Sequence, residues 1–295
     1  MLDALLSFYD SYQSTVAYVG INALLALSVY TSLSCGQLAL ASSGFAAIGA
    51  YASALLTLRA GWPFPLVLGV AVLLPAVLAL PLGLPVLRLK GVFLAIATIA
   101  FGEVIRIGLI NWAYVKGAEG LVAIPQKTSV WMIYLLLAAA LFVLGRLRGS
   151  KWGFALEAIR EDEPAAQTMG IPTGQYKLSM LVLGAALAGL AGALEAHFTF
   201  MVAPNGFTFR RVVDMLVFAV VGGAQLYWGP VAGAAFLTIL PELLRDLAPR
   251  VGIEPGPLRL LVNGLLLLLV ILFLPSGLVS LPRQVRRFRA ARSPE

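Results

Sequence analysis

Long, uninterrupted apolar blocks recur along this 295-residue chain and constrain its fold more than any other feature. An α-helix rises about 1.5 Å per residue, so about 20 apolar residues cross the roughly 30 Å of hydrocarbon in a bilayer. The blocks that approach this length are residues 15–33, 38–58, 64–87, 91–111, 129–145, 178–200, 212–226, 228–246 and 258–275. The sequence therefore predicts an all-α polytopic membrane protein with about nine transmembrane segments, and eight to ten remain compatible with the pattern. The short blocks 212–226 and 228–246 form either two spans or one broken re-entrant pair.

The composition excludes the main alternatives. Hydrophobic residues make up 60% of the chain and charged residues 12%, whereas soluble domains carry about 25% charged residues. A soluble enzyme could not cover its surface with so few charges. Transmembrane β-barrels alternate apolar and polar residues, unlike these continuous blocks. A single cysteine, Cys35, and a single histidine, His197, argue against a disulfide framework and against a multi-thiolate or His-based metal site.

The basic residues predict the orientation, because cytoplasmic loops of membrane proteins are enriched in Lys and Arg. With nine spans, Arg88 and Lys90, the loop 146–177 and the tail 283–295 all fall on one side, which is then the cytoplasm. The N-terminus lies outside and the C-terminus inside. We expect one transmembrane domain over residues 1–282 and a basic cytoplasmic tail over residues 283–295. The net charge of +7 then reflects these loops, and no nucleic-acid partner is expected.

A few polar residues inside the predicted spans are candidates for a translocation path. Polar and ionisable residues within a membrane are costly and often functional. Glu103 and Arg106 are three residues apart on one span and share a helix face, where a neutral packing pair is the alternative reading. Gln37 lies in a stretch of small residues, where hydrogen bonding between helices is the alternative. The predicted path residues are Gln37, Phe45, Thr98, Glu103 and Arg106.

The loop from 146 to 177 is the most informative polar segment. Residues 154–160 fit two helical turns, and Pro164 suits the first turn of a second short helix after Asp162 or Glu163. Gly170 suits a left-handed cap and is followed by Pro172 as a stop. Two short helices joined at an acidic elbow bury little surface by themselves, so we expect this element to dock against another protein. A solvated loop with helical propensity is the alternative.

Several chemical motifs are missing from the sequence. It contains no G-x-S-x-G nucleophile elbow, no H-E-x-x-H pair and no G-x-x-x-x-G-K-[ST] phosphate loop. Glu195 and His197, near the outer end of the sixth predicted span, have no catalytic partner at a recognisable spacing and are expected to be solvated. We therefore expect no enzymatic activity, no catalytic residues and no bound cofactor or metal in this chain itself.

The loop carries a specific resemblance. Residues 156–171 (LEAIREDEPAAQTMGI) resemble the EAA-type coupling loop of bacterial ABC importer permeases, and more narrowly the LivM-type permease of branched-chain amino acid importers. Residues 83–106, 222–234 and 240–245 are similar to further signatures of that family, so the resemblance covers most of the chain. One stretch departs from the family: after Gly36 and Gln37, the family often has Ser, Gly and His where this chain has Ala39, Ala41 and Ser42.

The resemblance implies that this chain works together with other subunits of a transporter. Two permease chains, this one and a LivH-type sibling, form the path in the lipid bilayer of the bacterial inner (cytoplasmic) membrane. Two ATP-binding subunits, which carry ATP and Mg²⁺, dock beneath, and a periplasmic substrate-binding protein delivers the substrate. The residues that the resemblance assigns to coupling with the ATPase are Glu157, Ala158, Ile159, Arg160, Glu161, Asp162, Ala165, Ala166, Met169 and Gly170.

Two other transport functions remain open at this stage. Related permeases import urea, amides or aromatic acids, so the substrate is not fixed by the sequence. An ion-coupled secondary transporter would need carboxylates in the middle of the membrane, and Glu103 is one of few such residues in this chain.

Overall fold

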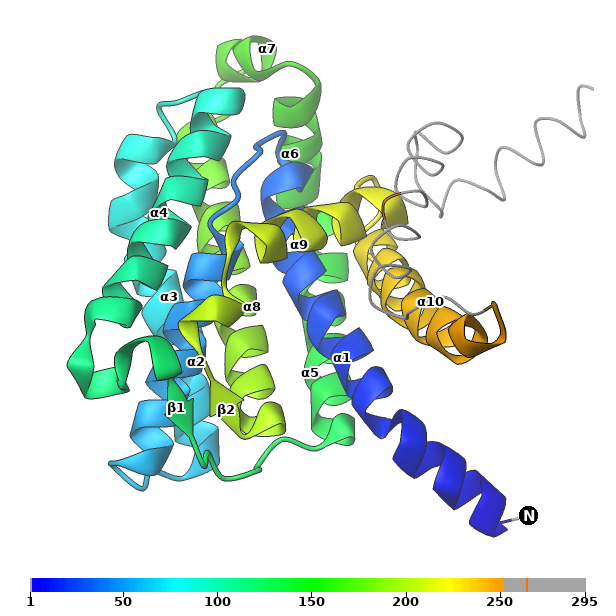
Figure 1. Cartoon of the computed structure of the whole chain (residues 1–295). Helices are drawn as coiled ribbons and strands as arrows, with labels where there is room; N and C mark the ends of the chain where they lie inside the picture. The colour runs from blue at the N-terminus through cyan, green and yellow to red at the C-terminus, as the bar shows by residue number, and fades with distance from the viewer. Residues whose placement is uncertain (1, 252–263, 265–295) are drawn as a thin grey trace, which may run out of the picture.

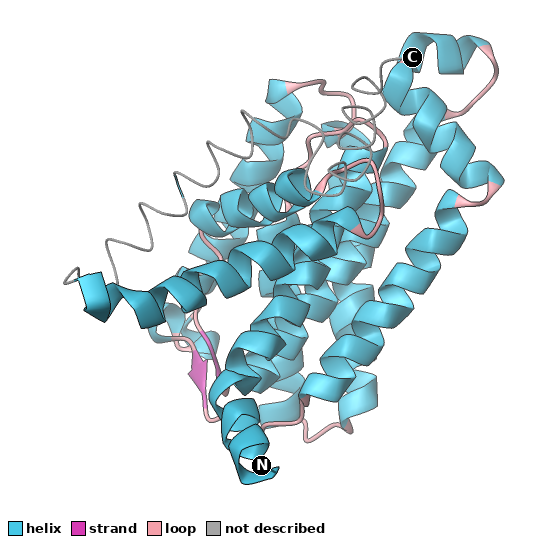
Figure 2. Ribbon diagram, turned by 90° about the vertical axis from the view of Figure 1, so that its right-hand side faces the viewer, coloured by secondary structure: helices cyan, strands magenta, loops and turns pink. Residues whose placement is uncertain are grey.

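The computed structural model describes residues 2–251 and residue 264, and it is built almost entirely from helices (Figures 1 and 2). The α-helices of this part of the chain are α1 (Leu2–Ser34), α2 (Ser42–Leu58), α3 (Phe64–Val86), α4 (Val92–Asn111), α5 (Val130–Arg148), α6 (Lys151–Glu161), α7 (Glu163–Thr168), α8 (Thr173–Thr199), α9 (Phe209–Gly222) and α10 (Gly229–Val251). Short 3₁₀ turns lie at Ala113–Val115, Gly117–Glu119 and Pro204–Gly206. Strands β1 (Leu121–Val122) and β2 (Met201–Val202) pair antiparallel.

Helix α8 forms the centre of the bundle, and α1, α2 and α3 pack around it (Figure 1). Its sequence makes this possible because small residues let helix backbones approach closely. A Cβ on Gly192 would lie 2.8 Å from the carbonyl carbon of Ala46 in α2, and one on Gly184 would lie 2.7 Å from the carbonyl oxygen of Ser28 in α1. Gly184, Gly189 and Gly192 of α8 are therefore points where neighbouring backbones touch it.

The outer helices expose their apolar side chains. Trp131 on α5 is 82% exposed and Phe93 on α4 is 74% exposed, while Leu24 on α1 and Leu194 on α8 are buried. Large apolar side chains on the outside of a bundle are expected where lipid or another subunit replaces water. Within the described residues, five helices are long and apolar enough to cross a bilayer, and they are Tyr12–Leu33 within α1, α3, α4, α5 and α8. The prediction of an all-α polytopic membrane protein is confirmed.

Two of the predicted spans differ from the structure, and a third lies outside the described residues. Residues 212–226 were predicted as a span or as half of a broken re-entrant pair with 228–246. Helix α9 has 14 residues and so reaches about 21 Å, less than the hydrocarbon thickness, which fits the second of these alternatives. It runs across the direction of the central helices (Figure 1). Helix α2 has 17 residues, because the first residues of the predicted span 38–58 are not helical. The predicted span 258–275 and the tail 283–295 lie outside the described residues, apart from Gly264.

The break between α1 and α2 is a regular helix stop followed by an extended run. Gly36 has a φ of +73°, which glycine adopts without strain. The Gly36 amide donates to the Leu33 carbonyl (3.0 Å) and the Gln37 amide to the Ser32 carbonyl (3.0 Å), the two bonds of a Schellman cap. Residues 37–41 then run without helical structure to the start of α2.

Candidate functional site

The loop between α5 and α8 folds as its sequence predicts. The Ser150 side chain accepts from the Trp152 amide and caps α6. The Asp162 side chain accepts from the Ala165 amide at 3.0 Å and caps α7. Gly170 ends α7 with a φ of +81°, and its amide donates to the Gln167 carbonyl at 3.0 Å. Both short helices therefore exist because of local caps, and the acidic elbow at Asp162 sets their turn.

Apolar residues on the inner face of α6 attach this loop to the membrane helices. Leu156 is buried with Cys35, at the end of α1, and with Met180 of α8 in one small cluster. The rings of Trp152 and Tyr176 pack 4.6 Å apart. Helix α6 therefore rests on the ends of α1 and α8 and is not a free surface loop.

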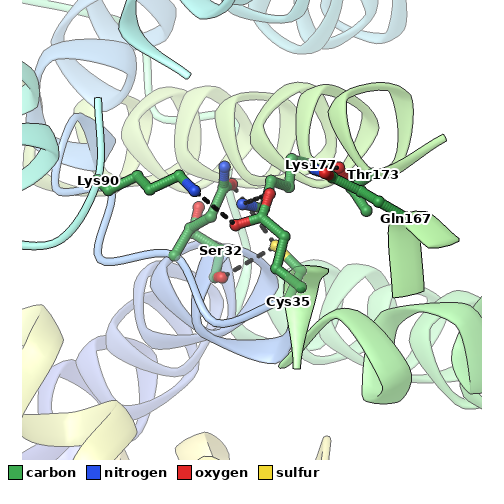
Figure 3. A network of polar contacts seen from close by, with 8 residues as sticks. Ser32, Cys35, Lys90, Gln167, Thr173 and Lys177 are labelled. Atoms are coloured by element: carbon green, nitrogen blue, oxygen red, sulfur yellow. Dashed lines mark hydrogen bonds and ion pairs between the residues drawn. The ribbon is translucent and has the colours of Figure 1, made fainter. Parts of the chain in front are cut away.

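A polar network fastens α7 to the same end of the bundle (Figure 3). The carboxylate of Glu163 accepts a 2.5 Å hydrogen bond from Lys177, at the start of α8, and lies 3.9 Å from the ammonium of Lys90, between α3 and α4. The Gln167 amide nitrogen donates to the buried Thr173 hydroxyl at 3.0 Å. The sequence analysis did not identify Glu163 or Lys177 as functional, because nothing local indicates that residues 14 positions apart will pair.

The ten predicted coupling residues divide into three groups by exposure. Ile159 and Ala166 are 3% and 4% exposed, so they support the loop from beneath and do not form its outer surface. Ala158 and Arg160 are half-buried. The residues at the surface are Glu157, Glu161, Asp162, Ala165, Met169 and Gly170. Met169 is 85% exposed, and Phe154 on α6, which the prediction omitted, is 70% exposed. The loop thus presents large apolar side chains and carboxylates together at one end of the molecule.

Three of the five predicted path residues lie together around the start of α2. Thr98 is completely buried on α4, where its hydroxyl donates to the Leu94 and Ala95 carbonyls (2.8 and 2.9 Å) and accepts from the Leu40 amide (2.8 Å). Phe45 is buried and its ring lies 5.2 Å from that of Phe101. These contacts hold α2 against α4.

Gln37 is also buried, and its side-chain oxygen accepts from the Cys35 thiol at 3.5 Å. Burial raises the pKa of Cys35 to about 12, so the thiol stays protonated. Gln37 therefore sits inside the protein at the turn between α1 and α2, next to the loop that carries α6.

The remaining two path residues form an ion pair. The Arg106 Nε donates to the Glu103 carboxylate at 2.7 Å, and the two side chains are 23% and 31% exposed. They flank the exposed face of α4 that includes Val104 and Ile107. The structure therefore separates this pair from the buried group around Thr98: the pair lies at the outer surface of the single chain.

At the end of the molecule opposite the loop, the contacts of Glu195 and His197 differ from the prediction. Glu195 and His197 were expected to be solvated, but His197 is completely buried. Its ring nitrogens lie 3.0 Å from the Pro125 carbonyl and 3.4 Å from the Thr57 hydroxyl. Glu195 forms an ion pair with Arg211, 2.9 Å away, at the start of α9. Sequence reasoning missed these contacts because the partners come from distant segments.

No group of three or more His, Cys, Asp or Glu side chains among the described residues is placed to hold a metal ion. Asp162 caps α7, and Glu163 pairs with Lys177 and Lys90, so these polar groups fix the shape of the loop. The loop is an exposed pair of short helices joined to several membrane helices. The fold and this loop define a multi-pass membrane protein with an exposed docking element.

Comparison with known proteins agrees with that class. Residues 11–271 match the family described as the permease component of branched-chain amino acid transport systems. The chain is 34% identical over 294 residues to the high-affinity branched-chain amino acid transport system permease protein LivM of Escherichia coli (strain K12), with 88% of this chain and 67% of that protein covered. It is 29% identical over 157 residues to the LivH permease of the same organism, with 53% and 48% covered. No solved structure matches.

This chain belongs to the family of branched-chain amino acid transport permeases, and it is a permease of the LivM type. A probable LivM of Methanocaldococcus jannaschii is 26% identical over 239 residues, which cover 72% of this chain and 68% of that protein. The resemblance to LivM extends over most of the chain, whereas the resemblance to LivH covers about half.

Proposed function

We propose that this chain is the LivM-type permease subunit of an ATP-driven importer that carries branched-chain or other hydrophobic amino acids across the cytoplasmic (inner) membrane. The LivM and LivH proteins that it resembles are permeases of high-affinity branched-chain amino acid transport. A LivH-type chain is the proposed sibling, and a substrate-binding protein delivers the amino acid from outside. Urea, amides or aromatic acids are the alternative substrates.

The observation that carries this proposal is the geometry of the loop 146–177. Its exposed surface combines Phe154 and Met169 with the carboxylates of Glu157 and Glu161. A lone water-facing loop gains nothing from exposed Phe and Met side chains, whereas exposed apolar side chains next to charged ones are typical of a docking surface. The loop is therefore proposed to be the coupling loop, which is bound by an ATP-binding subunit that carries ATP and Mg²⁺.

The proposed orientation places the coupling loop in the cytoplasm, with the N-terminus outside and the C-terminus inside. The ion pair between Lys90 and Glu163 supports it, because it brings two basic segments of the sequence to one end of the bundle. At the other end, Arg59 stacks on the ring of Tyr114 and donates to its carbonyl (2.7 Å). This orientation requires an odd number of crossings: nine if α9 crosses fully, or seven if α9 and α10, which pack on each other, form one broken re-entrant pair.

The proposed translocation path runs past Gln37, Phe45 and Thr98 inside the chain, and Glu103 and Arg106 face the second permease. The ion pair favours this over an ion-driven carrier, because Glu103 is already neutralised by Arg106 at 2.7 Å. A carrier that binds a proton or Na⁺ needs a carboxylate that is free to take it up. The 31% exposed carboxylate of Glu103 would instead be covered by the sibling chain.

The test is reconstitution in liposomes of the chain with its sibling, two ATP-binding subunits and the binding protein. ATP inside the vesicles should drive uptake of radiolabelled leucine, and an ion gradient without ATP should not. The double substitution Glu157→Ala and Gly170→Val should reduce uptake while the chain remains inserted, because it alters an exposed carboxylate and the φ of +81° that ends α7. Uptake by the chain alone under an ion gradient would refute the proposal, and unchanged uptake by the double variant would refute the role of the loop.

A further inference from the structure

The run of residues 35–41 between α1 and α2, here called the connecting segment, touches the coupling loop at one end and α4 at the other. At its first end, Cys35 packs with Leu156 of α6. Gly36 faces the same helix: a Cβ built on it would lie 3.4 Å from the Cα and 3.5 Å from the Cγ of Arg160. The backbone of α6 therefore lies directly on the start of the connecting segment.

At its other end the connecting segment is fastened to α4 by a single side chain. The Leu40 amide, in a residue only 6% exposed, donates to the Thr98 hydroxyl at 2.8 Å. Immediately beyond, α2 touches α4 at backbone distance, since a Cβ on Gly44 would lie 2.9 Å from the Cα of Gly102. The end of the connecting segment and the start of α2 are thus in direct contact with α4, which also carries the Glu103 ion pair.

An open pocket of about 50 Å³ lies beside α6, and its lining includes Tyr30 and Ser34 of α1, Leu144 of α5 and Leu156 of α6 itself. Residues 37–41 are not helical. A tightly packed interior transmits displacement between packed elements, and the connecting segment contacts both α6 and α4.

We propose that the connecting segment transmits movement of the coupling loop to α4 and so to the translocation path, with Gly36 and Thr98 as the positioning residues at its two ends. This proposal rests on the proposed function, because it requires an ATP-binding subunit to move the loop. Thr98, one of the proposed path residues, then also positions the connecting segment on α4 through its hydrogen bond with the Leu40 amide.

The experiment measures leucine uptake and ATP hydrolysis together in liposomes that contain the full transporter. Thr98→Val keeps the size of the side chain and removes the acceptor for the Leu40 amide, whereas Thr98→Ser keeps the hydroxyl. Thr128→Val is the matched control, because Thr128 is also buried but its hydroxyl has no hydrogen-bond partner among the described residues. We expect Thr98→Val to lower the amount of leucine moved per ATP about fivefold or more, Thr98→Ser to restore it, and Thr128→Val to leave it unchanged.

Gly36→Val tests the other end in the same assay. Gly61→Val is its control: Gly61 has a similar φ of +62°, but no heavy atom lies within 4 Å of its Cβ position. Both variants bear the same backbone strain, and only the one at Gly36 places a side chain against α6. We expect Gly36→Val alone to lower leucine moved per ATP. Loss of uptake and ATP hydrolysis in equal proportion, or equal effects of the two glycine variants, would overturn the proposal.

A second measurement on the unmodified transporter keeps the proposal testable if a variant does not assemble. Amide hydrogen exchange of residues 35–41 should change between the nucleotide-free state and the state trapped with ATP. Unchanged exchange in this segment, together with intact ATP-driven uptake, would overturn the proposal and leave the proposed function standing. Absence of ATP-driven uptake by the unmodified transporter would instead refute the proposed function itself.

Discussion

The contact between α8 and α2 allows a quantitative test of the packing in the bundle centre. Replacing Gly192 by Ala would place a Cβ 2.8 Å from the carbonyl carbon and 3.1 Å from the Cα of Ala46, and closer still to its carbonyl oxygen. Carbon atoms in contact normally lie about 3.5–4.0 Å apart. The added methyl group therefore requires α2 and α8 to separate by about 1 Å.

The cost of that separation follows from the loss of contacts along the interface. A gap of about 0.5–1 Å forfeits about a quarter to a half of the dispersion energy of each contact, and inserting a methylene into a packed core typically costs about 1–3 kcal/mol. Gly108→Ala on α4 is the matched control, because no heavy atom lies within 4 Å of its Cβ position. There, Ala should stabilise the helix by about 1 kcal/mol relative to Gly.

The assay is the thermal denaturation midpoint of the detergent-solubilised chain, followed by fluorescence-detected size-exclusion chromatography. We expect Gly192→Ala to lower the midpoint by several degrees and Gly108→Ala to leave it unchanged or raise it. A midpoint for Gly192→Ala equal to or above that of Gly108→Ala would show that α2 and α8 do not touch at these residues, and the arrangement of the bundle centre would be wrong.

Three further predictions concern the loop and its attachment. Cys35 should resist maleimide in the folded chain and react on denaturation, because burial raises the pKa of its thiol to about 12. The free energy of unfolding should fall as pH rises from about 9 to 12, since the thiol loses its proton first in the unfolded chain. Rapid labelling of the native chain at pH 7 would contradict the burial of Cys35. Asp162→Ala should destabilise α7 by about 0.5–2 kcal/mol through loss of its cap and reduce uptake, whereas Asp162→Asn, which can still cap the helix, should retain most of it. Lys177→Met should leave Glu163 without its closest partner and lower uptake, and Lys177→Arg should retain most of it; equal uptake by both variants would contradict a role for the ion pair.

The sequence predicts the parts of the structure that local signals determine. The coupling loop is the best example: the caps at Ser150 and Asp162 and the positive φ of Gly170 are set by neighbouring residues. The apolar blocks likewise predict the long spans, since length and hydropathy suffice to place a helix in a bilayer.

The parts that could not be predicted depend on contacts between distant segments. The partner of Glu163 is Lys177, and the partner of Glu195 is Arg211; neither pair follows from periodicity along one helix. The burial of His197 has the same origin.

The positions of the predicted path residues could not be predicted for a different reason. Thr98 and Phe45 were selected with Glu103 as one group, yet the structure buries the first two at the start of α2 and leaves Glu103 on the outer face of α4. Which face of a helix meets lipid, a sibling chain or the interior cannot be read from an all-apolar span, because every face is hydrophobic.

The most direct test of the central claim is cross-linking from the tip of the coupling loop. Met169, 85% exposed, is replaced by Cys in a Cys35→Ser background, which leaves one thiol in the chain, and a maleimide photo-cross-linker is attached in membranes that hold the whole transporter. The account predicts a covalent adduct with the ATP-binding subunit, and none from Val122→Cys on β1 in the same background. Labelling of the Met169→Cys thiol from outside intact cells by a membrane-impermeant maleimide, with no adduct to the ATP-binding subunit, would contradict it.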